Sequence, residues 1–518
     1  MNIIKVSFYL LLFFTISICQ EVKKKNGIST SGSMGSVTID GKIYNQIALR
    51  PEIPIGKLGI GLDFYLYFND EGIYKDGWNF SSFSSSYETI IDKIYYVKWG
   101  KPADNLYFKA GALPSATLGE GILVNNYSNI MQYPEIRQIG LDYKMKFFKN
   151  FGIEFIHSNF KQSSPGVIAG RLFYTPVSRL EFGFSYAIDA NQFAALKDSD
   201  EDNVPDVLDD FPEDALYQLD SDGDGLADTD PLETDVDNDG VDTFYWDKDS
   251  LDFITYEQEK LDALTLVYAD RGILDNDGVD SLKSRFNLDE NISSISGMAF
   301  DMTFKLTRNM GIYGQYAKLN TDEFMLSDST VSSGGWGFSF PGFFLKLGPV
   351  KFRAEYRQSG DYFMFNYWDQ AYDLTRVTVS GDIISTKSEQ LKKYTGLKGV
   401  YGDISANFLD MVWFNIAYQN LVGSNEQAID NGTLMGTLKI NTRKIPKVNM
   451  AEAFYQQSNV ENPFAFNFTE SSIAGYNLGF EVSEDMTLIY KNRTTYEKDA
   501  SGKIIPISSM QIETQLKF

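Results

Sequence analysis

The sequence predicts an all-β fold, a transmembrane antiparallel β-barrel, from three observations. Apolar and polar residues alternate through most of the chain, which is the side-chain period of a β-strand. Segments 57–70 and 134–147 are long enough to cross a bilayer as tilted strands, which needs about 9–11 residues. The chain begins with an export signal, and no later apolar run reaches the ~18 residues of a membrane helix.

The alternation is clearest in residues 57–70, where Leu58, Ile60 and Leu62 share one face and Asp63 and Tyr65 share the other. The same period runs through 138–147, 180–188, 298–306, 350–357, 476–482 and 510–518, and weaker strands are expected between them, at 37–49, 87–99, 150–157, 310–318, 393–407 and 411–421 among others. A soluble sandwich would turn the apolar face inward, whereas a membrane barrel turns it toward lipid. Export and strand length favour the barrel.

The last strand ends on Phe518 and looks like the C-terminal strand of bacterial outer-membrane barrels. From the chain length outside the signal and the insert described below, we expect about 16 strands, within a range of about 14–18, with an even total. A barrel of this size has room for an aqueous lumen.

Residues 1–19 have the features of a secretory signal, with Lys5 before an apolar stretch that ends near Ile16. Cleavage is expected near Cys19. Lipidation of Cys19 is the alternative, which the bulky Ile18 before it disfavours. The expected organisation is a signal at 1–19, the first part of the barrel at 20–190, an insert at 191–290 and the second part of the barrel at 291–518.

The formal net charge of −24 is concentrated in the insert. Residues 191–290 hold 31 acidic and 6 basic residues, and the rest of the chain holds 39 and 40. This balance disfavours nucleic acid as a partner, since phosphate binding requires a basic surface. The acidity marks one loop that either binds cations or is simply solvated.

Aspartates at alternate positions, followed by a turn residue, are how calcium loops present carboxylates at positions 1, 3 and 5 and a backbone carbonyl at position 7. The insert repeats this spacing three times, which predicts calcium ligands in copy one (Asp198, Asp200, Asp202, the Val204 carbonyl, Asp206, Asp209), copy two (Asp220, Asp222, Asp224, the Leu226 carbonyl, Asp228) and copy three (Asp235, Asp237, Asp239, the Val241 carbonyl, Asp242).

Residues 198–242 resemble thrombospondin type 3 repeats. The resemblance implies aspartates wrapped around structural calcium ions in a segment with little regular secondary structure. Asn203 stands where the pattern has glycine, and Pro231 and Trp246 replace the usual twelfth-position aspartate of copies two and three. Apolar residues at helical spacing over 251–274 predict a short helix packed on the repeats.

No enzymatic activity is expected. The chain has one His and one Cys, which leaves little basis for zinc, cysteine or Ser-His-Asp chemistry. His157 shares a face with Ile153 and Phe155, so we expect an interfacial residue. Trp99, Tyr174 and Trp413 fit the aromatic girdles of a membrane barrel.

The expected function is a porin-like outer-membrane channel for passive diffusion of small solutes, with a calcium-binding loop on the extracellular side. The expected partners are outer-membrane lipid, calcium ions and solutes in the lumen, and oligomerisation is left open. The alternative is a surface structural or adhesion protein that the barrel anchors. A soluble secreted sandwich is the third interpretation. Mixed charge on the polar face, including Arg171, Asp301, Arg353, Glu355 and Arg357, does not by itself define a solute.

Overall fold

A computed structural model describes most of residues 29–228 and 286–517, apart from short gaps in turns and loops, and between these ranges only short strands. In this part of the chain 22 strand segments join in one antiparallel sheet. They are β1 (Ser29–Ile39), β2 (Lys42–Ile55), β3 (Leu58–Leu62), β4 (Phe64–Asn69), β5 (Gly72–Ile73), β6 (Ile94–Trp99), β7 (Leu106–Gly111), β8 (Gly140–Phe147), β9 (Phe151–His157), β10 (Ile168–Val177), β11 (Leu180–Asp189), β16 (Ile295–Thr307), β17 (Met310–Thr321), β20 (Trp336–Leu347), β21 (Val350–Ser359), β24 (Leu397–Phe408), β25 (Val412–Gly423), β26 (Asn431–Ile440), β27 (Val448–Val460), β28 (Ile473–Ser483), β29 (Met486–Lys498) and β30 (Ile504–Lys517).

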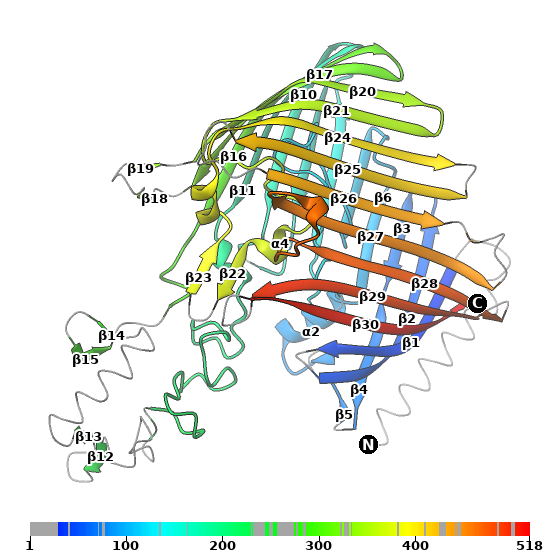
Figure 1. Ribbon diagram of the computed structural model, residues 1–518. Coiled ribbons are helices and arrows are strands. Elements are labelled where there is room, and N and C mark those ends of the chain that lie inside the picture. The colour runs from blue at the N-terminus through cyan, green and yellow to red at the C-terminus, as the bar shows by residue number, and fades with distance from the viewer. Residues whose placement is uncertain are drawn as a thin grey trace.

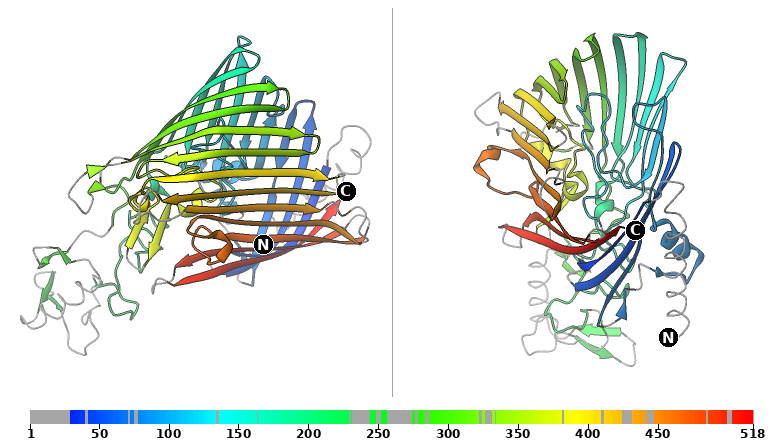
Figure 2. Two further views of the ribbon diagram at one scale, coloured as in Figure 1. Left: turned by 45° about the horizontal axis from the view of Figure 1, so that its top comes forward. Right: turned by 90° about the vertical axis from the view of Figure 1, so that its right-hand side faces the viewer.

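The sheet curves so that its first and last strands meet. Strands that follow one another in the chain pair along most of the sheet, while β2 pairs with both β3 and β4, and β3 pairs with β6. β1 pairs with both β2 and β30 (Figure 1). The two turned views show the strands wrapped around a common interior (Figure 2). Because β1 and β30 protect each other, neither leaves an unpaired edge along the residues they share.

The exposure of the wall residues is inverted relative to a soluble sheet. On β16, Phe300 is 56% exposed and Met302 41%, whereas the intervening Asp301 is only 6% exposed. On β25, Ile416 is 45% exposed while Gln419 is 3% exposed. Apolar side chains therefore cover the outside of the wall and polar side chains face the interior, which is the arrangement of a membrane barrel and the reverse of a sandwich.

Connections differ sharply between the two ends of the wall. At one end the strands are joined by short turns, such as those at 178–179, 308–309 and 348–349. At the other end lie the long connections 70–93, 112–139, 158–167, 190–294 and 360–396. The acidic insert is one of these long connections: β11 pairs directly with β16 along its full length, so residues 190–294 leave and rejoin adjacent strands.

Two long loops turn into the barrel and form its only sizeable apolar core among the described residues. The first inward loop (residues 112–139) supplies Tyr127, and the second inward loop (residues 360–396) supplies Trp368; both are fully buried. They pack against small or apolar interior residues of the wall, including Ala187, Ala299, Ala317 and Leu319. The second inward loop also carries α4 (Tyr372–Thr375), the hairpin β22 (Val377–Ser380) and β23 (Ile383–Thr386), and a 3-10 turn, η3 (Glu389–Lys393).

The described part of the insert contains a 3-10 turn, η2 (Gln192–Ala195), the first two aspartate copies, and two small hairpins. The hairpins are β12 (Phe244–Asp247) with β13 (Asp252–Thr255), and β14 (Leu274–Asp275) with β15 (Gly278–Leu282). The helix predicted over 251–274 is wrong at its start, because Phe253 lies in the strand β13 and pairs with Trp246 of β12. Residues 256–273 lie outside the described residues, as do the signal 1–19, Cys19 and Phe518.

The expectation of about 16 strands is too low. β3 and β4 are halves of one passage, and β5 is only a two-residue return arm that pairs antiparallel with the end of β4, so the 22 segments of the described sheet correspond to twenty passages. The expectation divided the chain length by an assumed length for one strand and its turn, and several passages and turns are shorter than that length. The strand β20 was missed because a bulge between Ser339 and Gly342, at Pro341, breaks its alternation.

Two other segments differ from the expected strands. Residues 87–91 belong to the helix α2 (Phe83–Ile91), whose backbone groups pair within the helix. The strand expected over 57–70 is interrupted at Asp63, whose backbone N–H donates to the Lys93 carbonyl instead of continuing the ladder. Among the described residues, no helix is long and apolar enough to cross a membrane.

The inverted wall predicts how charge on its outer face changes stability. Phe300→Arg should lower the free energy of unfolding in lipid vesicles by about 2–4 kcal/mol, because the charge would enter the hydrocarbon. Thr437→Arg, on an interior position, should have a much smaller effect. Urea unfolding of both variants in vesicles measures the difference; equal stability of the Phe300→Arg variant and the wild type would support a soluble fold.

Candidate channel lumen and calcium loops

The first inward loop is fixed to the wall by hydrogen bonds that use interior side chains. The Ile122 N–H donates to Gln315 Oε1 (3.1 Å), and Thr303 Oγ1 donates to Glu120 Oε1 (2.9 Å). Arg353 Nη1 donates to the Glu120 carbonyl (2.9 Å). The two inward loops join through a parallel bridge at Val124 and Trp368, so they form one unit inside the barrel.

The interior charges of the wall form compact ion pairs. Arg171 Nη2 lies 2.6 Å from Asp301 Oδ1 and 3.0 Å from Glu181 Oε1, and Arg357 Nε donates to Glu355 Oε1 (2.6 Å). A third group joins Asp63 to Arg50 (3.0 Å) and Arg137 (2.9 Å). The polar-face residues Arg171, Asp301, Arg353, Glu355 and Arg357 lie on the interior side of the wall, as expected, but these charges neutralise one another instead of facing an open pore.

A cavity of ≈ 390 Å³ lies between the inward loops and the wall strands β21 and β24–β28. Its loop side is formed by Asn125, Asn126 and Gln370, among others, and its wall side includes Arg353, Tyr401, Asp403, Trp413, Asn415, Thr437, Phe454 and Gln456. Trp413 therefore belongs to the interior, and its prediction as a girdle residue is wrong. Trp413 is separated from Ala417 and Gln419 of β25 by even numbers of residues, so the three share one face of the strand, and the other two are buried. The alternation therefore already indicates an interior position for Trp413.

A second cavity of ≈ 240 Å³ lies beside the second inward loop, where Asp369, Lys387, Ser458 and Glu470 are among its lining residues. Gln456, which lines the first cavity, donates to Asp369 Oδ2 of the second (3.4 Å). Gln456 and Asp369 therefore lie between the two cavities. Both cavities are spaces that the second inward loop leaves unfilled against the wall.

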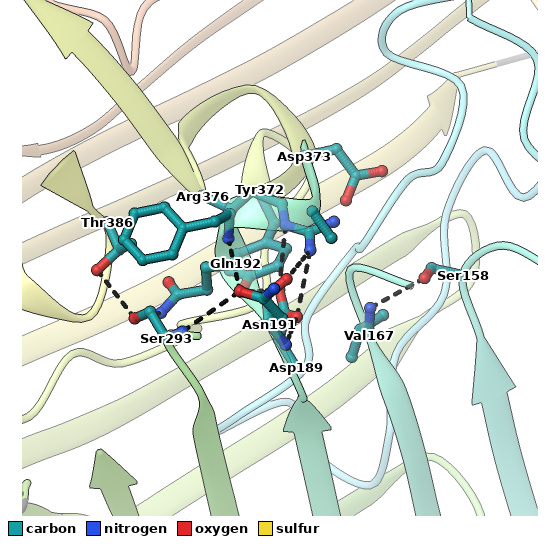
Figure 3. A network of polar contacts seen from close by, with 12 residues as sticks. Ser158, Val167, Asp189, Asn191, Gln192, Ser293, Tyr372, Asp373, Arg376 and Thr386 are labelled. Carbon is teal, nitrogen blue, oxygen red and sulfur yellow. Dashed lines mark hydrogen bonds and ion pairs between the residues drawn. The ribbon is translucent and has the colours of Figure 1, made fainter. Parts of the chain in front are cut away.

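The second inward loop is bound to both stems of the insert (Figure 3). On the outgoing stem, the Asp189 carboxylate accepts from Tyr372 OH (2.8 Å) and pairs with Arg376 Nε (3.1 Å), and Arg376 Nη2 donates to the Asn191 carbonyl (2.7 Å). On the returning stem, Ser293 Oγ donates to Thr386 Oγ1 (3.3 Å).

Gln192 connects the same three segments. Its Nε2 donates to Ser293 Oγ (3.2 Å) and to Ser388 Oγ (2.7 Å), and its Oε1 accepts from Tyr367 OH (3.0 Å). Gln192 is completely buried. Buried polar groups are costly to leave unpaired, so this network ties the base of the insert firmly to the loop inside the barrel.

Asp373 extends the network toward the first inward loop. Tyr127 OH lies 3.1 Å from its Oδ1 and 3.0 Å from its Oδ2. Burial raises the pKa of the Asp373 carboxyl to about 6, with Arg376 opposing the shift. Sequence reasoning missed this group because its members come from four segments far apart in the chain.

Copy one of the aspartate repeats gathers three of its predicted ligands. One carboxylate oxygen of each of Asp198, Asp200 and Asp202 lies within 4.8 Å of the other two. The loop is held by its own backbone: Asp198 accepts from the N–H groups of Glu201 (2.8 Å) and Asn203 (2.9 Å). Asp200 Oδ2 is buried without a hydrogen-bond partner among the described residues. Desolvation raises the pKa of Asp200, and the adjacent carboxylates of Asp202 and Asp198 raise it further.

Copy two has the same arrangement of carboxylates and backbone hydrogen bonds as copy one. Asp220, Asp222 and Asp224 form an equivalent triplet within 4.8 Å. Asp220 accepts from the N–H groups of Gly223 (2.7 Å) and Gly225 (2.9 Å), as Asp198 does from Glu201 and Asn203. Backbone φ is positive at Gly223 (77°) and Gly225 (96°), and likewise at Glu201 (64°) and Asn203 (74°). Asn203 therefore adopts the turn that glycine usually provides, which removes the sequence objection to copy one.

The remaining predicted ligands are placed differently. Asp206 binds the backbone N–H and hydroxyl of Ser199 (both 2.7 Å), and Asp228 binds those of Ser221 (2.7 and 2.6 Å). Asp209 accepts from the Phe211 N–H (2.8 Å). None of these three belongs to the triplets, and the Val204 and Leu226 carbonyls remain predicted ligands. Copy three, with Asp235, Asp237, Asp239, Val241 and Asp242, lies outside the described residues.

His157 stacks on Phe160, with ring centroids 4.1 Å apart and nearly parallel planes. It lies at the end of β9, where it pairs with Ile168 of β10. Stacking on an aromatic ring at a strand end agrees with the predicted structural, interfacial position.

No protein-family model and no curated protein matches the chain. Among solved structures it is similar to OccK5 of Pseudomonas aeruginosa (10% identity, 95% of this chain and 98% of that chain, TM-score 0.32). It is also similar to the outer-membrane channel DcaP of Acinetobacter baumannii (10%, 95% and 96%, TM-score 0.24) and the FrpB iron transporter of Neisseria meningitidis (8%, 97% and 83%, TM-score 0.34). At these TM-scores the likenesses identify neither family nor substrate, and the barrel assignment rests on strand pairing and on the inverted wall.

The network in Figure 3 predicts the effect of removing its cation. Arg376→Met should destabilise the protein by about 3–5 kcal/mol, because the buried Asp189 and Asp373 would lose their shared counter-charge. Limited proteolysis should then cut within residues 360–396. Arg308→Met, in an exposed short turn, is the control and should leave both unfolding and cleavage unchanged. Wild-type resistance of the Arg376→Met variant would show that apolar packing alone holds the loop.

Proposed function

We propose that the protein is an outer-membrane channel for passive diffusion of small solutes, with a structural calcium-binding loop at its extracellular mouth. The observation that carries this proposal is the combination of an apolar outer wall with polar-lined interior cavities that the inward loops leave unfilled. A protein that used the barrel only as an anchor would have no need of such cavities.

The long-loop end is assigned to the cell exterior. Long loops of outer-membrane barrels face outward and short turns face the periplasm. The insert and both inward loops belong to the long-loop end, so this orientation puts the aspartate copies where calcium is plentiful.

Calcium is the proposed ligand of copies one and two. Each copy presents three carboxylates on a preformed turn, and hard oxygen donors in a flexible loop suit calcium better than transition metals. The insert carries 31 acidic residues against 6 basic ones, so without cations its charges repel. Bound calcium would compact it, with an affinity of about 10⁻⁴–10⁻³ M, as in extracellular modules.

Compaction of the insert would stiffen the channel mouth through its stems. Copy one touches the returning stem directly, because the Leu288 N–H donates to the Asn203 carbonyl (2.8 Å). Phe193 of the outgoing stem packs on Phe286 of the returning one, with ring centroids 4.9 Å apart. Ser293 and Gln192 then pass the constraint to Ser388 and Thr386 of the second inward loop.

Calcium binding is tested by titrating the full-length protein in detergent. Asp198→Asn and Asp220→Asn should each remove one class of sites or weaken it by about tenfold or more, because each removes a carboxylate from a triplet. Glu213→Gln, an exposed acidic residue of the same segment, is the charge-matched control. Unchanged isotherms for both aspartate variants would leave the insert as a solvated acidic loop.

The channel function is tested by single-channel recording in planar bilayers. The purified protein should give steady conductance in calcium, and chelation should increase current noise as the second inward loop loosens. Arg376→Met should produce the same noise with calcium present. Absence of conductance with and without calcium would falsify the channel and favour the anchored adhesion protein.

A further inference from the structure

We infer that the 390 Å³ cavity is a binding site for a neutral, polyhydroxylated solute of about mono- to disaccharide size. This inference rests on the proposed channel function and specifies its substrate class. Three properties of the lining point to it: its charges cancel, several of its hydrogen-bonding groups are unused, and aromatic rings stand among them.

The cavity has no unpaired charge to attract an ion. Among the described residues, Arg353 and Asp403 are the only charged ones that line it, and Arg353 Nε donates to Asp403 Oδ2 at 2.6 Å. Arg353 Nη1 also donates to the Glu120 carbonyl (2.9 Å), and Arg353 Nη2 donates to Tyr401 OH (3.2 Å). A charged solute would lose its hydration here without gaining a counter-charge, so the site disfavours both anions and cations.

Hydrogen-bonding capacity on the wall side is left for a ligand. Within the described part of the chain, the Asn415 amide of β25 and the Thr437 hydroxyl of β26 have no hydrogen-bond partner. These two residues face each other across the strand pair, so their groups are adjacent. Gln456 is only 4% exposed, and its Oε1 accepts no hydrogen bond among the described residues. A buried amide oxygen is costly to leave unpaired, and a ligand hydroxyl can satisfy it.

Aromatic side chains complete the lining. Trp413 lies two residues before Asn415 on the same face of β25. Phe454 lies against Gly475, where any Cβ would come within 2.4 Å of Phe454 Cζ, so the glycine makes room for the ring. Rings beside amides and hydroxyls suit a solute with apolar C–H faces and hydroxyl edges, which is the chemistry of a sugar ring.

The loop side supplies a fixed polar counterpart. Asn126 Nδ2 donates to Gln370 Oε1 (3.3 Å), and Ser115 Oγ donates to Asn126 Oδ1 (2.5 Å). Asn126 has a positive φ of 58°, which turns the first inward loop at the cavity. These hydrogen bonds hold the loop side chains in fixed positions. A solute would therefore bind between the fixed loop and the unpaired polar groups of the wall.

The test measures current blockade by neutral and charged sugars in bilayers containing the full-length protein. Maltose and sucrose should interrupt the current and saturate, whereas gluconate and glucosamine should block at least about tenfold more weakly. The double variant Asn415→Ala/Thr437→Ala should weaken maltose binding by about tenfold. Asn420→Ala, an exposed amide on the outer face of the same strand, is the matched control.

Quenching of Trp413 fluorescence by maltose in detergent provides a second readout that does not need conductance, with Trp413→Phe as its control. Equal blockade by the charged sugars, or a double variant that binds maltose like the wild type, would overturn the inference. Sugar-dependent fluorescence without any conductance would retain the binding site and reject the channel. Absence of both blockade and quenching in a conducting protein would reject the binding site and retain the channel.

Discussion

Pairing of neighbouring strands around one curved sheet is the constraint on which the rest of the structure depends. The hydrocarbon of a membrane offers no hydrogen bonds to the backbone, so a sheet can cross it only if its edges meet. β1 and β30 meet at two residue pairs, Ser31 with Lys517 and Gly32 with Leu516. Once the sheet curves back on itself, alternate side chains must point either to lipid or to the interior, and the sequence places apolar residues at the first set and polar residues at the second.

The polar interior creates a second requirement, since a barrel with twenty passages encloses a wide space. Two long loops fill part of it and bring their own apolar core, in which Tyr127, Tyr367 and Trp368 are fully buried. The wall adapts to them by presenting alanine at Ala187, Ala299 and Ala317 on one side. On the other side, larger polar and aromatic residues leave a cavity. The uneven filling of the barrel, and not its width, therefore places the cavity.

The insert is connected to this filling and is not an independent appendage. Its stems end in Asp189, Gln192 and Ser293, and each is hydrogen-bonded to the second inward loop. The two aspartate copies share a hydrogen-bond pattern down to the serine that binds the last carboxylate. The two copies therefore share one backbone geometry, with positive φ at equivalent turn positions.

The sequence by itself determined the strand period, the inverted faces and the spacing of the aspartates, because each depends on residues a few positions apart. It located Asp198, Asp200 and Asp202 together, and it separated Asp301 from Phe300 by parity alone. The sequence could not give the number of passages, because that expectation assumed one average length for every strand and turn. The turns differ in length, and the bulge in β20 hides its alternation. The sequence did not identify the group of Asp189, Arg376, Tyr372 and Tyr127, nor the cavity beside Asn415 and Thr437. Only the tertiary structure decided these, because they arise where loops far apart in the chain enter one barrel and fill it unequally.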